Sequence, residues 1–162
     1  MENIYRFARK WMIIPGISYS QRKNLRAEDY NSKTNVISDY PGARTSAALN
    51  YQLGVFYDLG NQHKINATAS RKTRFATFKD RYSYRMGTAI PNPDLKPEMS
   101  DNFDITYSGK VWSKVHVQAS VFYSQLSNAI LSVSNVQPGK SQMQNTGRAV
   151  FKGIELAMHY QI

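Results

Sequence analysis

The sequence predicts an all-β protein whose antiparallel strands run up and down a sheet in the order of the chain. Two observations support this fold class. Apolar and polar side chains alternate with a period of two in several stretches, and the links between the stretches are alternately short and long. In residues 101–108, for example, Phe103, Ile105 and Tyr107 share one face and leave the other face to polar side chains. No stretch reaches the roughly 18 uninterrupted apolar residues that a membrane-spanning helix requires.

The alternation predicts about six strands. In the first, Pro15 withholds one hydrogen-bond donor from the sheet. In the fifth, Phe122 stands in the polar row as a single exception to the pattern. The predicted strands lie at residues 11–19, 49–57, 63–70, 101–108, 115–123 and 154–162.

The links between these strands differ in length in a regular way. Residues 58–62 and 109–114 are short and contain glycine, which predicts tight turns. The other links, at about 22–45, 71–98 and 128–143, are long and polar. Bacterial outer-membrane barrels have short periplasmic turns and long extracellular loops. We therefore predict that residues 1–162 form one domain, a segment of an antiparallel up-and-down transmembrane β-barrel in the Gram-negative outer membrane.

Aromatic side chains mark both ends of the apolar rows. In the first predicted strand, Trp11 and Tyr19 are eight residues apart. At about 3.3 Å per residue and a tilt near 40°, this spacing gives roughly 20 Å, close to the apolar height of a bilayer. Amphipathic rings collect at the two boundaries of a membrane. A soluble β-sandwich would show the same alternation, and tyrosine is common on strands in any case. The predicted lipid-facing belt consists of Trp11, Tyr57, Tyr107 and Tyr160 at one depth and of Tyr19 and Tyr123 at the other.

Positive charge is concentrated in the first half of the chain. Residues 1–85 hold 15 basic and 6 acidic side chains, and the stretch RKTRFATFKDRYSYR at 71–85 interleaves cations with aromatic rings. Such a loop could attract an anionic ligand, or it could neutralise the phosphates of lipopolysaccharide. A soluble module that binds nucleic acid is the alternative, but no nucleic-acid recognition motif is present, so no nucleic acid is expected as a partner. The candidate ligand contacts are Lys72, Arg74, Lys79, Arg81, Tyr82 and Arg85.

Signals of catalysis are weak. The chain has no cysteine, which excludes disulfides and thiolate metal sites. The GKS at 139–141 lacks the glycine that a phosphate-binding loop needs, and His63, His116 and His159 are isolated in the sequence. We therefore expect neither an enzyme nor a catalytic residue, metal site or cofactor.

Two segments resemble the barrel of TonB-dependent outer-membrane receptors. The first is the stretch at 69–109, in which the family pattern N-P-x-L-K-P-E, present here as NPDLKPE, precedes a strand. The second is QNTGRAVFKGIELAMHYQI at 144–162. The resemblance implies a barrel of about 22 strands, filled by a plug, that imports iron–siderophore complexes, cobalamin or glycans with energy from TonB. The matching residues are Asn92, Pro93, Leu95, Lys96, Pro97, Glu98, Asn145, Gly147, Gly153 and Glu155.

The chain departs from that family pattern in what it lacks. It contains no recognisable plug, TonB-contacting segment, signal peptide or closing strand. We therefore expect an internal part of a longer barrel, which TonB would reach only through a plug outside this chain. The lipid and lipopolysaccharide of the outer membrane and an anionic ligand are the other expected partners. Additional strands near Val36–Tyr40 and Tyr82–Met86 would instead give a small barrel of eight strands.

Overall fold

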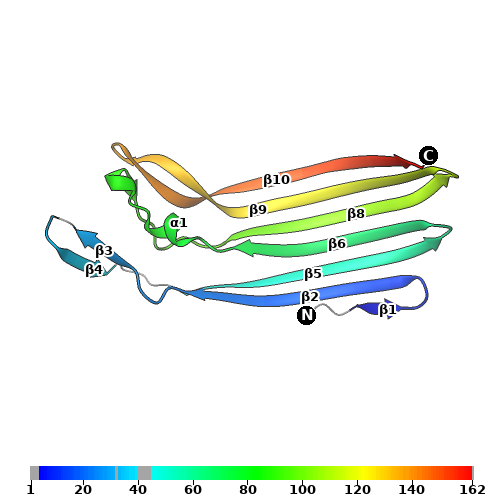
Figure 1. The fold of residues 1–162 in the computed structure, drawn as a ribbon, viewed down its shortest axis with the longest axis horizontal. Helices are drawn as coiled ribbons and strands as arrows, with labels where there is room; N and C mark the ends of the chain where they lie inside the picture. Colours follow the sequence, from blue (N-terminus) through cyan, green and yellow to red (C-terminus); the bar gives the residue numbers. More distant parts are fainter. Residues whose placement is uncertain (1–3, 32, 40–44, 162) are drawn as a thin grey trace.

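The computed structural model describes residues 4–31, 33–39 and 45–161. Its main feature is a single layer of long strands that lie side by side (Figure 1). No second sheet covers either face in the part of the chain that is described, so the alternative of a β-sandwich is wrong. The long strands are β2 (Trp11–Lys23), β5 (Thr45–Gly60), β6 (His63–Arg74), β8 (Glu98–Trp112), β9 (Val115–Gln137) and β10 (Lys140–Tyr160).

Short elements complete the fold. The sheet has the order β1-β2-β5-β6-β8-β9-β10-β7, so it is open, with a short strand at each edge. All its neighbours are antiparallel except β7, which pairs with β10 in parallel. A separate hairpin is formed by β3 and β4. The short elements are β1 (Tyr5–Phe7), β3 (Glu28–Asn31), β4 (Val36–Asp39), α1 (Phe78–Tyr82), the 3₁₀ helix η1 (Arg85–Gly87) and β7 (Ala89–Ile90).

The first five predicted strands each lie within one of the long strands. The sixth, at 154–162, lies in β10 as far as Tyr160; Gln161 follows the end of that strand, and Ile162 is outside the described residues. The prediction of a long loop at 128–143 is wrong. There β9 and β10 continue as a hairpin that turns at residues 138–139, where Gly139 has a φ of +70°. The eight-stranded alternative is also wrong, because residues 82–86 end α1 and begin η1 and because Val36–Asp39 pairs only with β3. Tyr40 lies outside the described residues.

Local chemistry explains the turns and the tolerated proline. Asn61 and Gln62 both have positive φ values, 52° and 67°, as a two-residue hairpin turn between β5 and β6 requires. Pro15 lies opposite Leu53 in β5, whereas β1 pairs only with residues 11–13 of β2. Beyond those residues β2 is an edge strand in the described structure, so the missing N–H of Pro15 interrupts no ladder on its open side.

The strand register brings the predicted apolar rows together on one face of the sheet, here called the apolar face. Ile105 is 60% exposed and Ile154 is 78% exposed, so this face is not the core of a globule. No helix among the described residues is long and apolar enough to cross a membrane. The central row runs through Ile13, Val55, Ala67, Ile105, Val121 and Ile154.

The opposite side, here called the polar face, is held together by hydroxyl and amide contacts between strands. The Thr106 and Ser120 hydroxyl oxygens lie 2.9 Å apart and both residues are buried. Phe122, the exception in the sequence pattern, also lies here, opposite Gly153. A Cβ at Gly153 would be 2.8 Å from the Phe122 ring, so the ring occupies the space over the glycine. The aromatic exception therefore covers exposed backbone on the polar face.

Candidate functional site

The loop between β6 and β8, residues 75–97 and here called the rim loop, folds against the end of the sheet opposite the short turns (Figure 1). It begins with α1, whose first turn is closed by a capping box. Thr77 Oγ1 accepts a hydrogen bond from the Asp80 backbone N–H at 3.1 Å, and the Asp80 carboxylate accepts one from the Thr77 N–H at 2.9 Å. Burial acts to raise the pKa of Asp80, but the Thr77 hydrogen bonds and the charge of Arg74 outweigh it and lower the pKa.

The two family-like segments meet at this loop. Lys96 donates its backbone N–H to Asn145 Oδ1 at 2.8 Å, and Asn145 Nδ2 donates to the Lys96 carbonyl at 2.9 Å. The same Nδ2 also donates to the carbonyl of Asn128, and Asn92 Nδ2 donates to the carbonyl of Met143. The pairing register between β9 and β10 shifts on either side of Gly147, two residues after Asn145. The motif residues therefore fasten the rim loop to β9 and β10.

A small core lies beneath these contacts. Leu95 is 2% exposed and clusters with Ala76, Ile130 and Met143. Glu98 accepts hydrogen bonds from Arg74 Nε and, at 2.6 Å, from the Ile130 backbone N–H. The Arg74 hydrogen bond first, and the Ile130 N–H in addition, lower the pKa of Glu98 although burial opposes them. The last motif residue, Glu155, lies elsewhere, exposed and opposite Ser120 on the polar face.

Arg81 and Tyr82, two of the predicted ligand contacts, are buried within the loop. The Arg81 guanidinium binds three acceptors: its Nη atoms donate to the carbonyls of Pro93 and Leu95 and to Ser46 Oγ of β5. The Tyr82 hydroxyl accepts a hydrogen bond from Asn24. Arg74 is also engaged, by Glu98 and Asp80. The stretch 71–85 therefore presents no continuous basic and aromatic strip.

Lys79 and Arg85 come together at a pocket of about 240 Å³ between α1, η1 and β10. Both side chains are exposed and carry positive charge. The carboxylate of Asp80 also reaches this pocket, but it is already bound by Thr77 and Arg74. The rest of the lining is partly polar, from Ser83, Ser132, Ser141 and Gln142, and partly apolar, from Ala89, Ile90 and Met143. This pocket has the donors that an anionic ligand requires.

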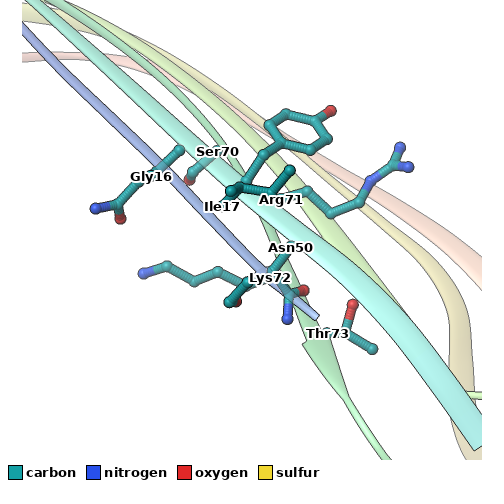
Figure 2. Close-up of a pocket in the computed structure, with 10 residues that line it drawn as sticks. Gly16, Ile17, Asn50, Ser70, Arg71, Lys72 and Thr73 are labelled. Atoms are coloured by element: carbon teal, nitrogen blue, oxygen red, sulfur yellow. The ribbon is translucent and has the colours of Figure 1, made fainter. Parts of the chain in front are cut away.

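Lys72 lies apart from them, at a concavity of about 420 Å³ where β2, β5 and β6 meet. Figure 2 shows Lys72 and Arg71 on opposite sides of the sheet, as their neighbouring positions in a strand require. Lys72 shares the polar face with Gly16, Asn50 and Ser70. A buried oxygen, Asn50 Oδ1, has no hydrogen-bond partner within the described protein. The structure therefore does not bring the six predicted ligand contacts together. Lys72 lies in one pocket and Lys79 and Arg85 in another, Arg81 and Tyr82 are inside the loop, and Arg74 is held in ion pairs at the end of β6.

The predicted aromatic belt lies along the apolar face. Trp11, Tyr57 and Tyr107 fall in one cross-strand row, and the Trp11 and Tyr57 ring centroids are 4.4 Å apart. The other two rings are out of line with their rows. Tyr160 is displaced from this row, and Tyr123 from the row of Tyr19, in both cases along the strand toward the short-turn end. A displacement in the same direction at both depths is the stagger that tilted barrel strands produce.

Some contacts of the rim loop come from residues that no sequence motif marks, namely Ser46, Asn128 and Ile130. Asn128 has a φ of 56°, which asparagine tolerates better than most residues. An asparagine within an otherwise alternating strand was therefore the available signal for this position. Ser46 and Ile130 carry no such local signal, because their roles depend on what folds against them.

Comparison with known proteins identifies the barrel. Residues 1–161 match the family described as TonB dependent receptor-like, beta-barrel. No curated protein matches the sequence. Solved structures that resemble this chain include the copper transporter OprC, with a TM-score of 0.71 and 19% identity over 98% of this chain. The double mutant of the Serratia marcescens hemophore receptor HasR, in complex with hemophore HasA and heme, gives 0.69 and 16% over 98%. The siderophore receptor PirA from Pseudomonas aeruginosa gives 0.69 and 16% over 96%.

This chain spans only 26% of OprC, 30% of HasR and 26% of PirA. At such identities the solved structures show the fold alone, whereas the family match covers nearly every residue. The chain belongs to the β-barrel family of the TonB-dependent receptors, which are proteins of the Gram-negative outer membrane.

Proposed function

We propose that this chain forms part of the barrel wall of a receptor that takes up a bulky nutrient across the outer membrane. The observation that supports it is the apolar face, whose rows stay in register over six strands and remain uncovered. Such a face is stable in contact with lipid hydrocarbon, with the aromatic belt at the two boundaries. The polar face then lines the interior, where a plug outside this chain would couple the barrel to TonB.

An iron–siderophore complex is the nutrient we favour, before cobalamin or a glycan. The solved structures that resemble this chain include a siderophore receptor, a hemophore receptor in complex with its hemophore and heme, and a copper transporter. We assign ligand contact to Lys79 and Arg85 in the rim-loop pocket and to Lys72 on the polar face, because their charges are exposed. The working parts are loops and lining residues, and the receptor is a transporter without a catalytic centre.

Two measurements test this function on the intact receptor that contains this chain. Insertion into the outer membrane is followed by detergent dependence and by heat-modifiable migration on a gel. Ligand contact is tested with a ferric tris-catecholate complex as the probe. The double variant Lys79→Ala/Arg85→Ala should bind it at least about tenfold more weakly, because two charge-assisted contacts are lost.

Lys33→Ala is the matched control, because Lys33 is an exposed cation between β3 and β4 and lines no pocket described above. Equal affinity of the double variant and the control would contradict the ligand assignment. A freely soluble protein that binds oligonucleotides in a salt-dependent way would contradict the receptor function itself.

A further inference from the structure

Two of the three histidines, although isolated in the sequence, lie directly opposite each other in the sheet. His116 in β9 pairs with His159 in β10. The register between these strands does not shift from Arg148 to the end of β10, and beyond that end the Gln161 N–H still donates to the Lys114 carbonyl at 2.8 Å. A regular ladder therefore fixes the backbone on both sides of the histidine pair.

The pair lies on the polar face, at the short-turn end of the sheet. The neighbouring pair, Val117 and Met158, belongs to the apolar rows, so alternation directs the two histidines to the other side. Both histidine side chains are exposed. His116 also borders a hollow of about 520 Å³, together with Lys64 and Ser108. Water and dissolved ions therefore reach the rings.

Neither ring of the pair is engaged by another side chain. Within the described part of the chain, His116 and His159 form no hydrogen bond and no ion pair. The third histidine differs, because His63 Nδ1 lies 2.7 Å from the Tyr107 hydroxyl oxygen, on the apolar face. The ring nitrogens of His116 and His159 are therefore available to a ligand, whereas His63 already has a partner.

The geometry of the pair suits a metal ion held between the rings. Side chains directly opposite each other in antiparallel strands have Cβ atoms about 4.5 to 5.5 Å apart. Metal–imidazole bonds are about 2.0 to 2.1 Å long, so rings at this separation can turn toward one ion. No group of three histidine, cysteine or carboxylate side chains among the described residues could hold a metal. Water would therefore complete the coordination of an ion bound by the pair.

The nature of the ligands selects the class of metal. Imidazole nitrogen suits copper, nickel and zinc, whereas Mg²⁺ and Ca²⁺ prefer oxygen ligands. The nearest cations are Lys110, opposite His116 in β8, and Lys114, in the turn before β9. A lysine ammonium lies at the end of a flexible four-carbon stem and is strongly hydrated, so it can stay away from the rings.

We propose that His116 and His159 form a two-imidazole binding site for a late first-row divalent metal ion. Cu²⁺ should bind most tightly, followed by Ni²⁺ and Zn²⁺, in the general order for such ligands. A bound ion would join β9 to β10 at the short-turn end of the polar face. This inference goes beyond the uptake function proposed above, because it depends on the strand register and not on the nutrient.

The test uses Cu²⁺ alone as the probe, added to the intact receptor without an affinity tag and in detergent. Titration calorimetry measures the affinity, and electron spin-echo envelope modulation counts the imidazoles bound to the ion. At one equivalent of Cu²⁺ the wild type should show two imidazoles. The double variant His116→Gln/His159→Gln should lose this signal and bind Cu²⁺ at least about tenfold more weakly, and excess Mg²⁺ should not compete in the wild type.

His63→Gln is the matched control, because it removes a histidine at the same end of the sheet but on the opposite face. It should keep the wild-type affinity for Cu²⁺. Equal binding by the double variant and this control overturns the proposal. A wild-type spectrum with a single imidazole also overturns it, and this result does not depend on whether the variants fold. Heat-modifiable migration of each variant shows that its barrel has folded.

Discussion

Lys96 and Asn145, which are 49 positions apart in the sequence, exchange two hydrogen bonds across the junction of the rim loop and β10. The Asn145 side chain thus satisfies both backbone groups of a residue that belongs to no strand, as a neighbouring strand would. Its third contact, to the Asn128 carbonyl, ties the same point to β9. One amide therefore connects three segments of the chain.

Asn145→Ala should release the rim loop. Three hydrogen bonds are lost and the Lys96 N–H is left without its acceptor, which should cost about 2 to 3 kcal/mol. The measurement is amide hydrogen exchange of residues 91–97 in the folded receptor, which should become faster. Gln161→Ala, at an exposed amide beyond the end of β10, is the control. Unchanged exchange in the Asn145 variant would show that other contacts suffice to hold the loop.

Arg81→Ala should destabilise the same loop more strongly, by about 3 kcal/mol or more, because buried carbonyls and the Ser46 hydroxyl lose a charged donor. Arg81→Lys should not restore it, since an ammonium lacks the planar fork that reaches several acceptors. Denaturant unfolding of the refolded receptor measures both. Lys79→Ala, at an exposed position of α1, should change stability by no more than about 0.5 kcal/mol. Full stability of the lysine variant would refute the role given to the fork.

Glu98 makes the attachment of the loop sensitive to acid. It lies beyond the apolar rows, and its pKa is lowered chiefly by the Arg74 hydrogen bond. A carboxyl group whose pKa is lowered in the folded state stabilises the fold at pH values above its ordinary pKa, about 4.3 for glutamate. That contribution is lost as the pH falls through the lowered pKa. Amide exchange at Ile130 should therefore accelerate below about pH 4.3. Glu98→Gln should remove this dependence and Glu28→Gln should retain it; an acid response that survives in Glu98→Gln would assign it to another group.

Ile105→Arg tests which face meets lipid. Ile105 lies in the central row of the apolar face, so a charge there should cost about 2 to 4 kcal/mol near the bilayer midplane. Thr68→Arg places the same charge at a similar depth on the polar face, where it lies opposite Asp104 and should be tolerated. The amount of heat-modifiable protein in outer-membrane fractions measures both. Equal assembly of the two variants would reverse or abolish the assignment of faces.

Gly153 and Phe122 should be coupled. Gly153→Ala places a Cβ 2.8 Å from the Phe122 ring as it stands, so the ring must move at a cost of about 1 kcal/mol. In the background Phe122→Ala the same substitution should cost little, because the space is empty. A double-mutant cycle of unfolding free energies measures the coupling. Additive changes in unfolding free energy would mean that the position of the Phe122 ring does not depend on the absence of a side chain at Gly153.

The sequence by itself determined the strands and their two faces. Alternation is a local property, because successive side chains of a strand point to opposite sides whatever lies next to them. The tight turn at Asn61 and Gln62 was likewise predictable from local chemistry. The prediction of a long loop at 128–143 was wrong because the local sequence there is polar, as in a loop. Strand structure arises in this stretch only from the pairing of β9 with β10.

Only the tertiary structure decided what the loop residues do. Arg81 and Arg85 look alike in a basic stretch, yet one is 4% exposed and binds carbonyls while the other faces a pocket. The concavity beside Lys72 likewise depends on β2, β5 and β6 lying next to one another. Burial and hydrogen bonding are set by segments distant in sequence, so a period of two fixes the direction of a side chain but not its partner.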